Sequence, residues 1–270
     1  MLVLRALTKV FSTDAGDRIA ALDGIDLTVP TGQFLVIVGT NGSGKTTLMN
    51  VIAGSEHCDA GSIVLDDHNI TELTGYRRAA MIGRVFQDPM RGTIPELTVV
   101  ENLALAASKT VPRGFRIAVG RQFREECHRK LSALGIGLES RLQQRVSTMS
   151  GGQRQVLSLV MAAWHRPALL LLDEHTAALD PKSADLVLKM TQSIISREKV
   201  TAIMVTHSMQ QAARMGDRLI VMHRGSIVRD ISGTEKRLLR SPELLEEFEA
   251  LRSSDLIDES VSGLLRRQYI

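Results

Sequence analysis

The chain contains few aromatic residues, few cysteines and little excess charge of either sign. Aromatic residues account for 3% of its 270 positions, too few for a base-stacking platform or an aromatic-lined sugar site. The formal net charge is only +3, so the charge balance does not predict binding to nucleic acid. The two cysteines, Cys58 and Cys127, share no metal or redox spacing, which argues against a disulfide framework and fits a reducing compartment.

Long apolar runs are also missing. The longest cover residues 34–38 and 168–172, far below the roughly 20 residues that span a bilayer. The N-terminal stretch is interrupted by Arg5 and Lys9 and has no small-residue cleavage site, so it does not resemble a signal peptide. We therefore expect a soluble protein whose membrane role would come through a partner.

What the chain does contain is an alternation of buried strands and helices. A continuous apolar run at 33–39 predicts a buried strand, followed by a helix at 45–53 that ends at Gly54. An Asp180-Pro181 pair predicts the capped start of another helix, which runs to about Arg197. Further strands are predicted at 168–173, 201–207 and 218–223. This order predicts a parallel sheet with right-handed crossovers.

Other parts of the chain have a different pattern. Alternating residues at 25–29 and 62–65 predict a small antiparallel sheet. Between about 88 and 164 the pattern is helical, with amphipathic helices expected at 95–107 and 120–134, and a helical stretch is expected near 242–251.

A glycine-rich loop follows the first buried strand and precedes the first helix. It fits G-x-x-x-x-G-K-[ST], and we expect it to bind nucleotide through Gly39, Asn41, Gly42, Ser43, Gly44, Lys45, Thr46 and Thr47. The glycines let successive backbone N–H groups face a phosphate, Lys45 supplies a charge for the β- and γ-phosphates, and Thr46 is a Mg²⁺ ligand. Kinases, GTPases, helicases and transport ATPases share this loop. The absence of an Asn-Lys-x-Asp sequence favours ATP over GTP.

Two acids follow the strand at 168–173. Asp173 ends that strand and is predicted to hold Mg²⁺ through water, while Glu174 is predicted to polarise the attacking water. Farther back, Ser150, Gly151, Gly152 and Gln153 precede an apolar helix and predict a second anion-binding helix N-terminus. One ATP does not need two such sites from one subunit, so this segment is expected to close over the ATP of a second copy.

These motifs and their order resemble an ATP-binding-cassette (ABC) transporter ATPase over about residues 2–225. The resemblance implies that Gln87 senses Mg²⁺ and the γ-phosphate, that His207 contacts the γ-phosphate, that Asp180 belongs to the D-loop and that Phe11 stacks on adenine. Each has a plainer interpretation: a loop amide, a core histidine, a helix cap and a core aromatic.

The resemblance implies an α/β fold: a P-loop NTPase with a RecA-like parallel-sheet core, a small antiparallel β subdomain and an inserted α-helical subdomain. The core is expected at 1–87 and 165–225, with its antiparallel part near 1–33 and 61–66. The helical signature subdomain is expected at 88–164 and a C-terminal extension at 226–270. Two positions depart from the family pattern, His175 and Thr40, where proline is usual; neither removes a group that the chemistry needs.

The resemblance also implies ATP and Mg²⁺ as cofactors and an ATPase that drives a separate integral-membrane permease at the cytoplasmic face of the cell membrane. A second copy of the ATPase and an extracytoplasmic solute-binding protein are expected partners, and nucleic acid is not. The run from Asp173 to Pro181 is similar to a branch linked to uptake of aromatic or related amino acids. An exporter or lipid-extraction ATPase stays open as an alternative. A soluble ABC ATPase in translation or DNA repair is disfavoured, because the chain has one set of motifs and no coiled-coil heptads.

Overall fold

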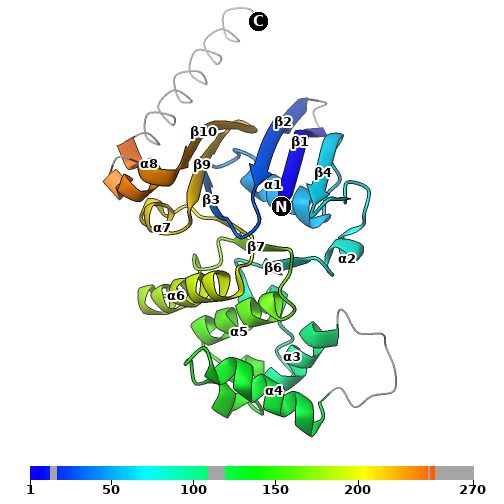
Figure 1. Cartoon of the computed structure of the whole chain (residues 1–270), viewed down its shortest axis with the longest axis vertical. Helices are drawn as coiled ribbons and strands as arrows, with labels where there is room; N and C mark the ends of the chain where they lie inside the picture. The colour runs from blue at the N-terminus through cyan, green and yellow to red at the C-terminus, as the bar shows by residue number, and fades with distance from the viewer. Residues whose placement is uncertain (13–16, 109–118, 243, 247–270) are drawn as a thin grey trace, which may run out of the picture.

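A computed structural model describes residues 1–12, 17–108, 119–242 and 244–246. Two β-sheets lie at one end of the molecule, and α3, α4 and α5 lie together at the other (Figure 1). The larger sheet has six strands in the order β10-β9-β3-β8-β7-β6. These strands are β3 (Phe34–Gly39), β6 (Ile82–Val85), β7 (Leu169–Asp173), β8 (Ala202–Val205), β9 (Arg218–His223) and β10 (Ser226–Ser232). All neighbours are parallel except β10, which pairs antiparallel with β9, so the predicted parallel sheet is confirmed.

The large sheet is buried on both faces. Along β3, Val36 and Val38 belong to one hydrophobic cluster, whereas Leu35 and Ile37 belong to the other. Side chains alternate across a strand, so a strand covered on both faces needs an unbroken apolar sequence. This explains why the strand appeared in the sequence as a continuous run and not as an alternation.

The smaller sheet is antiparallel, as the sequence predicts, with the order β2-β1-β4-β5. Its strands are β1 (Leu2–Ser12), β2 (Arg18–Val29), β4 (Ala60–Leu65) and β5 (His68–Asn69).

Helices connect and cover these sheets. They are α1 (Lys45–Ala53), α2 (Gly75–Arg78), α3 (Val99–Ala107), α4 (Arg121–Ser132), α5 (Gly151–Ala163), α6 (Pro181–Glu198), α7 (Met209–Arg214) and α8 (Gly233–Leu238), with short 3₁₀ turns at Pro89–Gly92, Leu138–Arg141 and Val146–Thr148.

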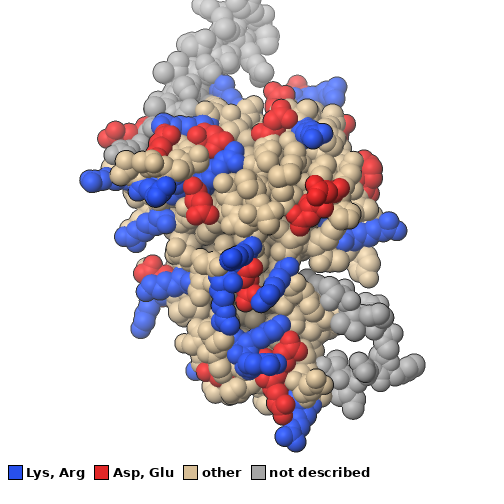
Figure 2. Space-filling model, in the orientation of Figure 1, with Lys and Arg blue, Asp and Glu red and all other residues tan. Residues whose placement is uncertain are grey.

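Lys and Arg side chains gather around acidic ones in the middle of the face shown in Figure 2, and charges of both signs are spread over the rest of it.

Local capping fixes several helix ends. Gly54 takes a left-handed conformation at the end of α1, and the Asp180 carboxylate accepts a hydrogen bond from the Ser183 N–H at the start of α6. Both ends agree with the sequence prediction. The helix predicted at 95–107 begins later, at Val99, because Thr98 and Glu101 form a capping box.

At other ends, one predicted strand is shorter in the structure and one helix was not predicted. The strand predicted at 201–207 stops at Val205, because the Thr206 hydroxyl accepts the Ser208 N–H and starts a turn. The helix α8 was missed, since its sequence is polar and lacks an apolar stripe. The stretch predicted near 242–251 lies largely outside the described residues.

The far end of α1 is held by a buried arginine. The Arg78 guanidinium donates to the carbonyls of Val51 and Ile52 at 2.6 and 2.9 Å, and to those of Leu73 and Thr71 at 2.9 and 2.7 Å. The last carbonyls of a helix lack the partners that continue the helical pattern, and the bond to Ile52 satisfies one of them, while the Val51 carbonyl also accepts from the Gly54 N–H. The helix that begins in the glycine-rich loop is thereby attached at its other end to the segment 71–73.

Candidate functional site

The glycine-rich loop joins β3 to α1 and depends on glycine at its turns. Gly44 has φ 97°, and a Cβ there would lie 2.2 Å from the Ala21 carbonyl oxygen. Gly42 has φ 77°, a region that other residues rarely adopt. The loop can therefore wind closely at the start of the helix, where backbone N–H groups are unpaired.

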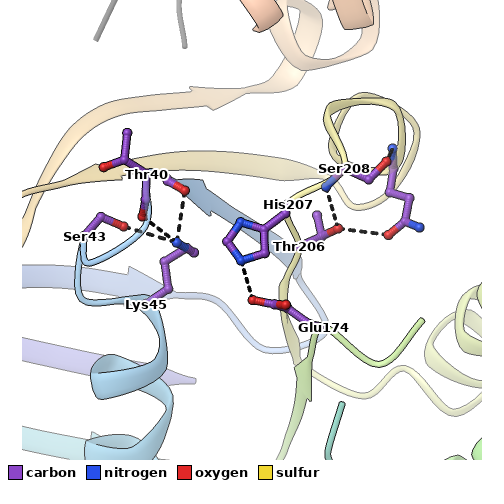
Figure 3. Close-up of polar contacts among 9 residues, drawn as sticks. Thr40, Ser43, Lys45, Glu174, Thr206, His207 and Ser208 are labelled. Atoms are coloured by element: carbon purple, nitrogen blue, oxygen red, sulfur yellow. Dashed lines mark hydrogen bonds and ion pairs between the residues drawn. The ribbon is translucent and has the colours of Figure 1, made fainter. Parts of the chain in front are cut away.

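Lys45 lies inside this loop and is buried. Its Nζ donates to the carbonyls of Gly39 and Thr40 at 3.0 and 2.8 Å and contacts the Ser43 hydroxyl at 3.3 Å (Figure 3). Burial lowers the pKa of Lys45, and the negative charges of Glu174 and Asp173 oppose that shift. The loop thus positions an ammonium group that faces two carboxylates.

A pocket of about 510 Å³ opens beside the loop. Four residues predicted from the sequence meet in it: Thr46 from α1, Gln87 after β6, and Asp173 and Glu174 at the end of β7. The rest of its lining comprises Asn50, Arg84, Phe86, Asp88, Arg91 and Ala178. Since β6 and β7 are parallel neighbours, their carboxyl ends bring these residues to one edge of the sheet.

Glu174 and His207 are in direct contact. The His207 Nε2 lies 2.6 Å from Glu174 Oε1 (Figure 3). Glu174 has φ 44°, an uncommon value for a residue with a side chain. His207 lies two residues beyond β8, and its side chain is 45% exposed, so it is not the buried core histidine of the plainer interpretation.

The Ser150–Gln153 segment begins α5 with a capping box: Ser150 accepts the Gln153 N–H, and the Gln153 side chain accepts the Ser150 N–H. A Cβ on Gly152 would lie 2.8 Å from the Ser183 side chain, so glycine permits close packing against α6. Among the described residues that line the pocket, none comes from this segment. The helix is joined to the pocket indirectly, because Gln155 Nε2 donates to the Phe86 carbonyl at 2.9 Å.

Comparison with known proteins agrees with this geometry. The sequence profile described as ABC transporter matches residues 22–177. The chain belongs to the ABC transporter family. It is 40% identical over 249 residues to a tyrosine transport ATP-binding protein of Clostridioides difficile (strain R20291), covering 92% of this chain and 99% of that one. It is 35% identical to an aliphatic sulfonates import ATP-binding protein of Agrobacterium fabrum (strain C58), covering 86% and 82% of the two chains.

Solved structures of cassettes share the fold. One is the ADP conformation of an ATP-binding cassette of an ABC transporter, with a TM-score of 0.77, 25% identity and coverage of 93% and 98%. Another is a dimeric cassette in a post-hydrolysis state bound to ADP and Pi, with a TM-score of 0.71, 28% identity and coverage of 86% and 98%. This ABC cassette therefore has the predicted P-loop fold, and ATP binding and hydrolysis are its activity.

Phe11 and Asp180 of this ABC cassette are among the predicted residues that do not line the pocket. Phe11, near the end of β1, is 40% exposed, and Lys9 Nζ lies 5.3 Å from its ring centroid. Asp180 caps α6, and its hydrogen bonds to Ser183 lower the pKa of its carboxyl group. The structure places an accessible aromatic ring and a capping acid at these positions.

His175, in place of the family's usual proline, is a packing residue of the cassette. It is buried, and its Nε2 lies 3.0 Å from the Thr191 hydroxyl on α6. Burial lowers its pKa to about 4, so the ring is neutral near pH 7. Within the described part of the chain, no cluster of three or more His, Cys, Asp or Glu could hold a metal.

Sequence reasoning missed two residues that organise the cassette's site. Gln211 bridges Thr206, before His207, and Thr176, after Glu174, with contacts of 2.9 and 3.1 Å. Arg84 Nη2 donates to Asp173 Oδ2 at 3.1 Å. No local motif distinguishes Gln211 from any other glutamine on a helix. Arg84 could have been found, because a charged residue within an apolar strand needs a partner of opposite charge.

Proposed function

We propose that this cassette hydrolyses ATP to drive solute uptake through a separate membrane permease, and that the solute is an amino acid of the tyrosine type. The observation that carries the proposal is the pocket in which Thr46, Gln87, Asp173 and Glu174 meet beside Lys45. The import direction and the substrate class are supported by the relatives, of which a tyrosine transport protein matches this chain over 99% of its own length.

The residues of the pocket and of the segments around it have separate roles in this proposal. Lys45 and the N–H groups of the loop bind the phosphates, and the glycines at 39, 42 and 44 with Asn41, Ser43 and Thr47 complete the loop. Glu174 accepts a proton from the attacking water, and His207 orients Glu174 and contacts the γ-phosphate. Gln87 senses the γ-phosphate, and Phe11 stacks on the adenine.

Mg²⁺ fits the donor set of this pocket. The Thr46 hydroxyl, the Gln87 amide oxygen and the Asp173 carboxylate are oxygen donors lining one cavity, which is what this ion prefers. A bound Mg²⁺ would supply charge stabilisation to the phosphates.

A second copy completes the site in this proposal. Ser150–Gln153 offers an anion-binding helix start outside the pocket of its own chain, so it suits the ATP of a partner cassette, with Asp180 at the shared interface. The dimeric cassette among the similar structures supports this arrangement.

The remaining partners are a permease and an extracytoplasmic solute-binding protein. No helix in the described parts of this chain has the length and apolar character needed to cross a bilayer. The family and the transport relatives support a peripheral position at the cytoplasmic face of the membrane, held by the permease.

The test is a pull-down of the tagged full-length chain from its native membranes in mild detergent, followed by uptake assays. We expect a multi-spanning permease to co-purify, and labelled tyrosine uptake to be lost in cells that carry Lys45→Ala instead of the wild-type chain. Recovery with ribosomes or nucleic acid and no membrane protein would overturn transport. Recovery of a permease with unchanged tyrosine uptake would overturn the substrate class only.

A further inference from the structure

Arg84 lies at the metal side of the pocket and is held from three directions. Its Nη2 donates to Asn50 Oδ1 at 2.8 Å and to Asp173 Oδ2 at 3.1 Å. The guanidinium carbon lies 4.8 Å from the ring centroid of Phe86. These partners come from α1, from the end of β7 and from the segment that leads to Gln87, so Arg84 is fixed between the elements that carry Thr46, Asp173 and Gln87.

The contact between Arg84 and Asp173 is sheltered from water. Each side chain is only 14% exposed. Charges in such surroundings interact several times more strongly than they do in water, and removing one member of a sheltered pair changes the field felt by any other ion nearby. A cation bound by Asp173 would be affected in this way.

We propose that Arg84 is the resident counter-ion of Asp173 and lowers the affinity of the pocket for a divalent cation. This rests on the proposed role of Asp173 as a metal ligand. The guanidinium already neutralises part of the carboxylate's charge and repels a second cation. As a positioning residue, Arg84 thus keeps metal-nucleotide binding weak enough for the product to leave after hydrolysis.

The experiment measures Mn²⁺ binding to the ADP complex of the full-length chain by electron paramagnetic resonance, so that no turnover occurs. Arg84→Met keeps an unbranched apolar stem over Phe86 and removes the charge, and we expect it to bind Mn²⁺ roughly tenfold more tightly. Arg84→Lys keeps the charge and should stay within about threefold of wild type. The affinity of each variant for ADP, measured in EDTA, verifies that the variant is folded. If Arg84→Met does not fold, Arg84→Gln takes its place.

Two further variants distinguish the ways in which the proposal could be wrong. Arg77→Met removes an exposed arginine on α2, outside the pocket lining, and should leave Mn²⁺ binding unchanged; equal tightening would show a general charge effect and overturn the role of Arg84. Unchanged or weaker Mn²⁺ binding by the charge-free Arg84 variant would also overturn it. Asp173→Asn should weaken Mn²⁺ binding in otherwise wild-type protein, and failure there would refute the metal role of Asp173 itself.

Discussion

The His207 imidazole contacts the Glu174 carboxylate across the ends of two neighbouring parallel strands, with Nε2 and Oε1 2.6 Å apart. Glu174 lies in the left-handed backbone region. In the proposed mechanism these two residues are the proton acceptor and its orienting group, and Asp173 and Thr46 line the same pocket as Glu174.

Replacing Glu174 with Gln should preserve ATP binding and lower hydrolysis by at least about 100-fold, because the amide cannot accept a proton from water. Phosphate release and fluorescent-nucleotide binding measure the two effects. With ATP present, the variant should elute as a dimer in size-exclusion chromatography. Glu72→Gln, at an exposed position, is the matched control. Turnover near the wild-type rate would refute the assignment of Glu174.

Replacing Lys45 with Ala should weaken ATP binding by roughly 10- to 100-fold, because a charge-assisted contact to the phosphates is lost. Isothermal titration calorimetry gives the dissociation constant directly. The same change at exposed Lys189 should have no effect. If the alanine variant kept its affinity for ATP, the Lys45 ammonium of the wild-type chain would serve only to hold the loop carbonyls that it contacts in this structure.

Replacing His207 with Ala should lower kcat by about tenfold or more while nucleotide affinity stays within about threefold, since the residue acts on Glu174 and the γ-phosphate in the reaction. Steady-state ATPase kinetics separate kcat from KM. His57→Ala, at an exposed position, is the control. If affinity fell with kcat unchanged, His207 would be a binding residue.

The two thiols should differ sharply in reactivity. Burial raises the pKa of Cys127 to about 12, so at pH 8 only about one molecule in 10,000 has the thiolate there. Cys58 is partly exposed. A thiol reagent should therefore label one cysteine per native chain and two in guanidinium chloride.

The same shift has a consequence for stability. The pKa of Cys127 in the folded protein lies above its ordinary value of 9.0. Its contribution to the free energy of unfolding is therefore complete below pH 9 and is lost as the pH rises towards 12.

Rapid labelling of Cys127 in native protein at pH 8 would contradict its burial.

The features that could be predicted from the sequence are those that depend on a local pattern of residues. The strand at 34–39, the loop from Gly39 to Thr46 and the cap at Asp180 are each determined by residues within a few positions of one another. The contacts of Arg84 with Asp173 and of Gln211 with Thr176 join residues 89 and 35 positions apart. Such pairs depend on strand order and helix placement, which periodicity does not report, and α8 was missed because its sequence lacks an apolar stripe.

The bonds from Arg78 give α1 a mechanical role. This helix starts at Lys45, where phosphates would bind. Near its other end, the Val51 and Ile52 carbonyls accept hydrogen bonds from Arg78, which also donates to the carbonyls of residues 71 and 73. Because Arg78 ties the far end of this helix to residues 71–78, we expect nucleotide binding at Lys45 to alter the position of that surface, where Tyr76 is 85% exposed.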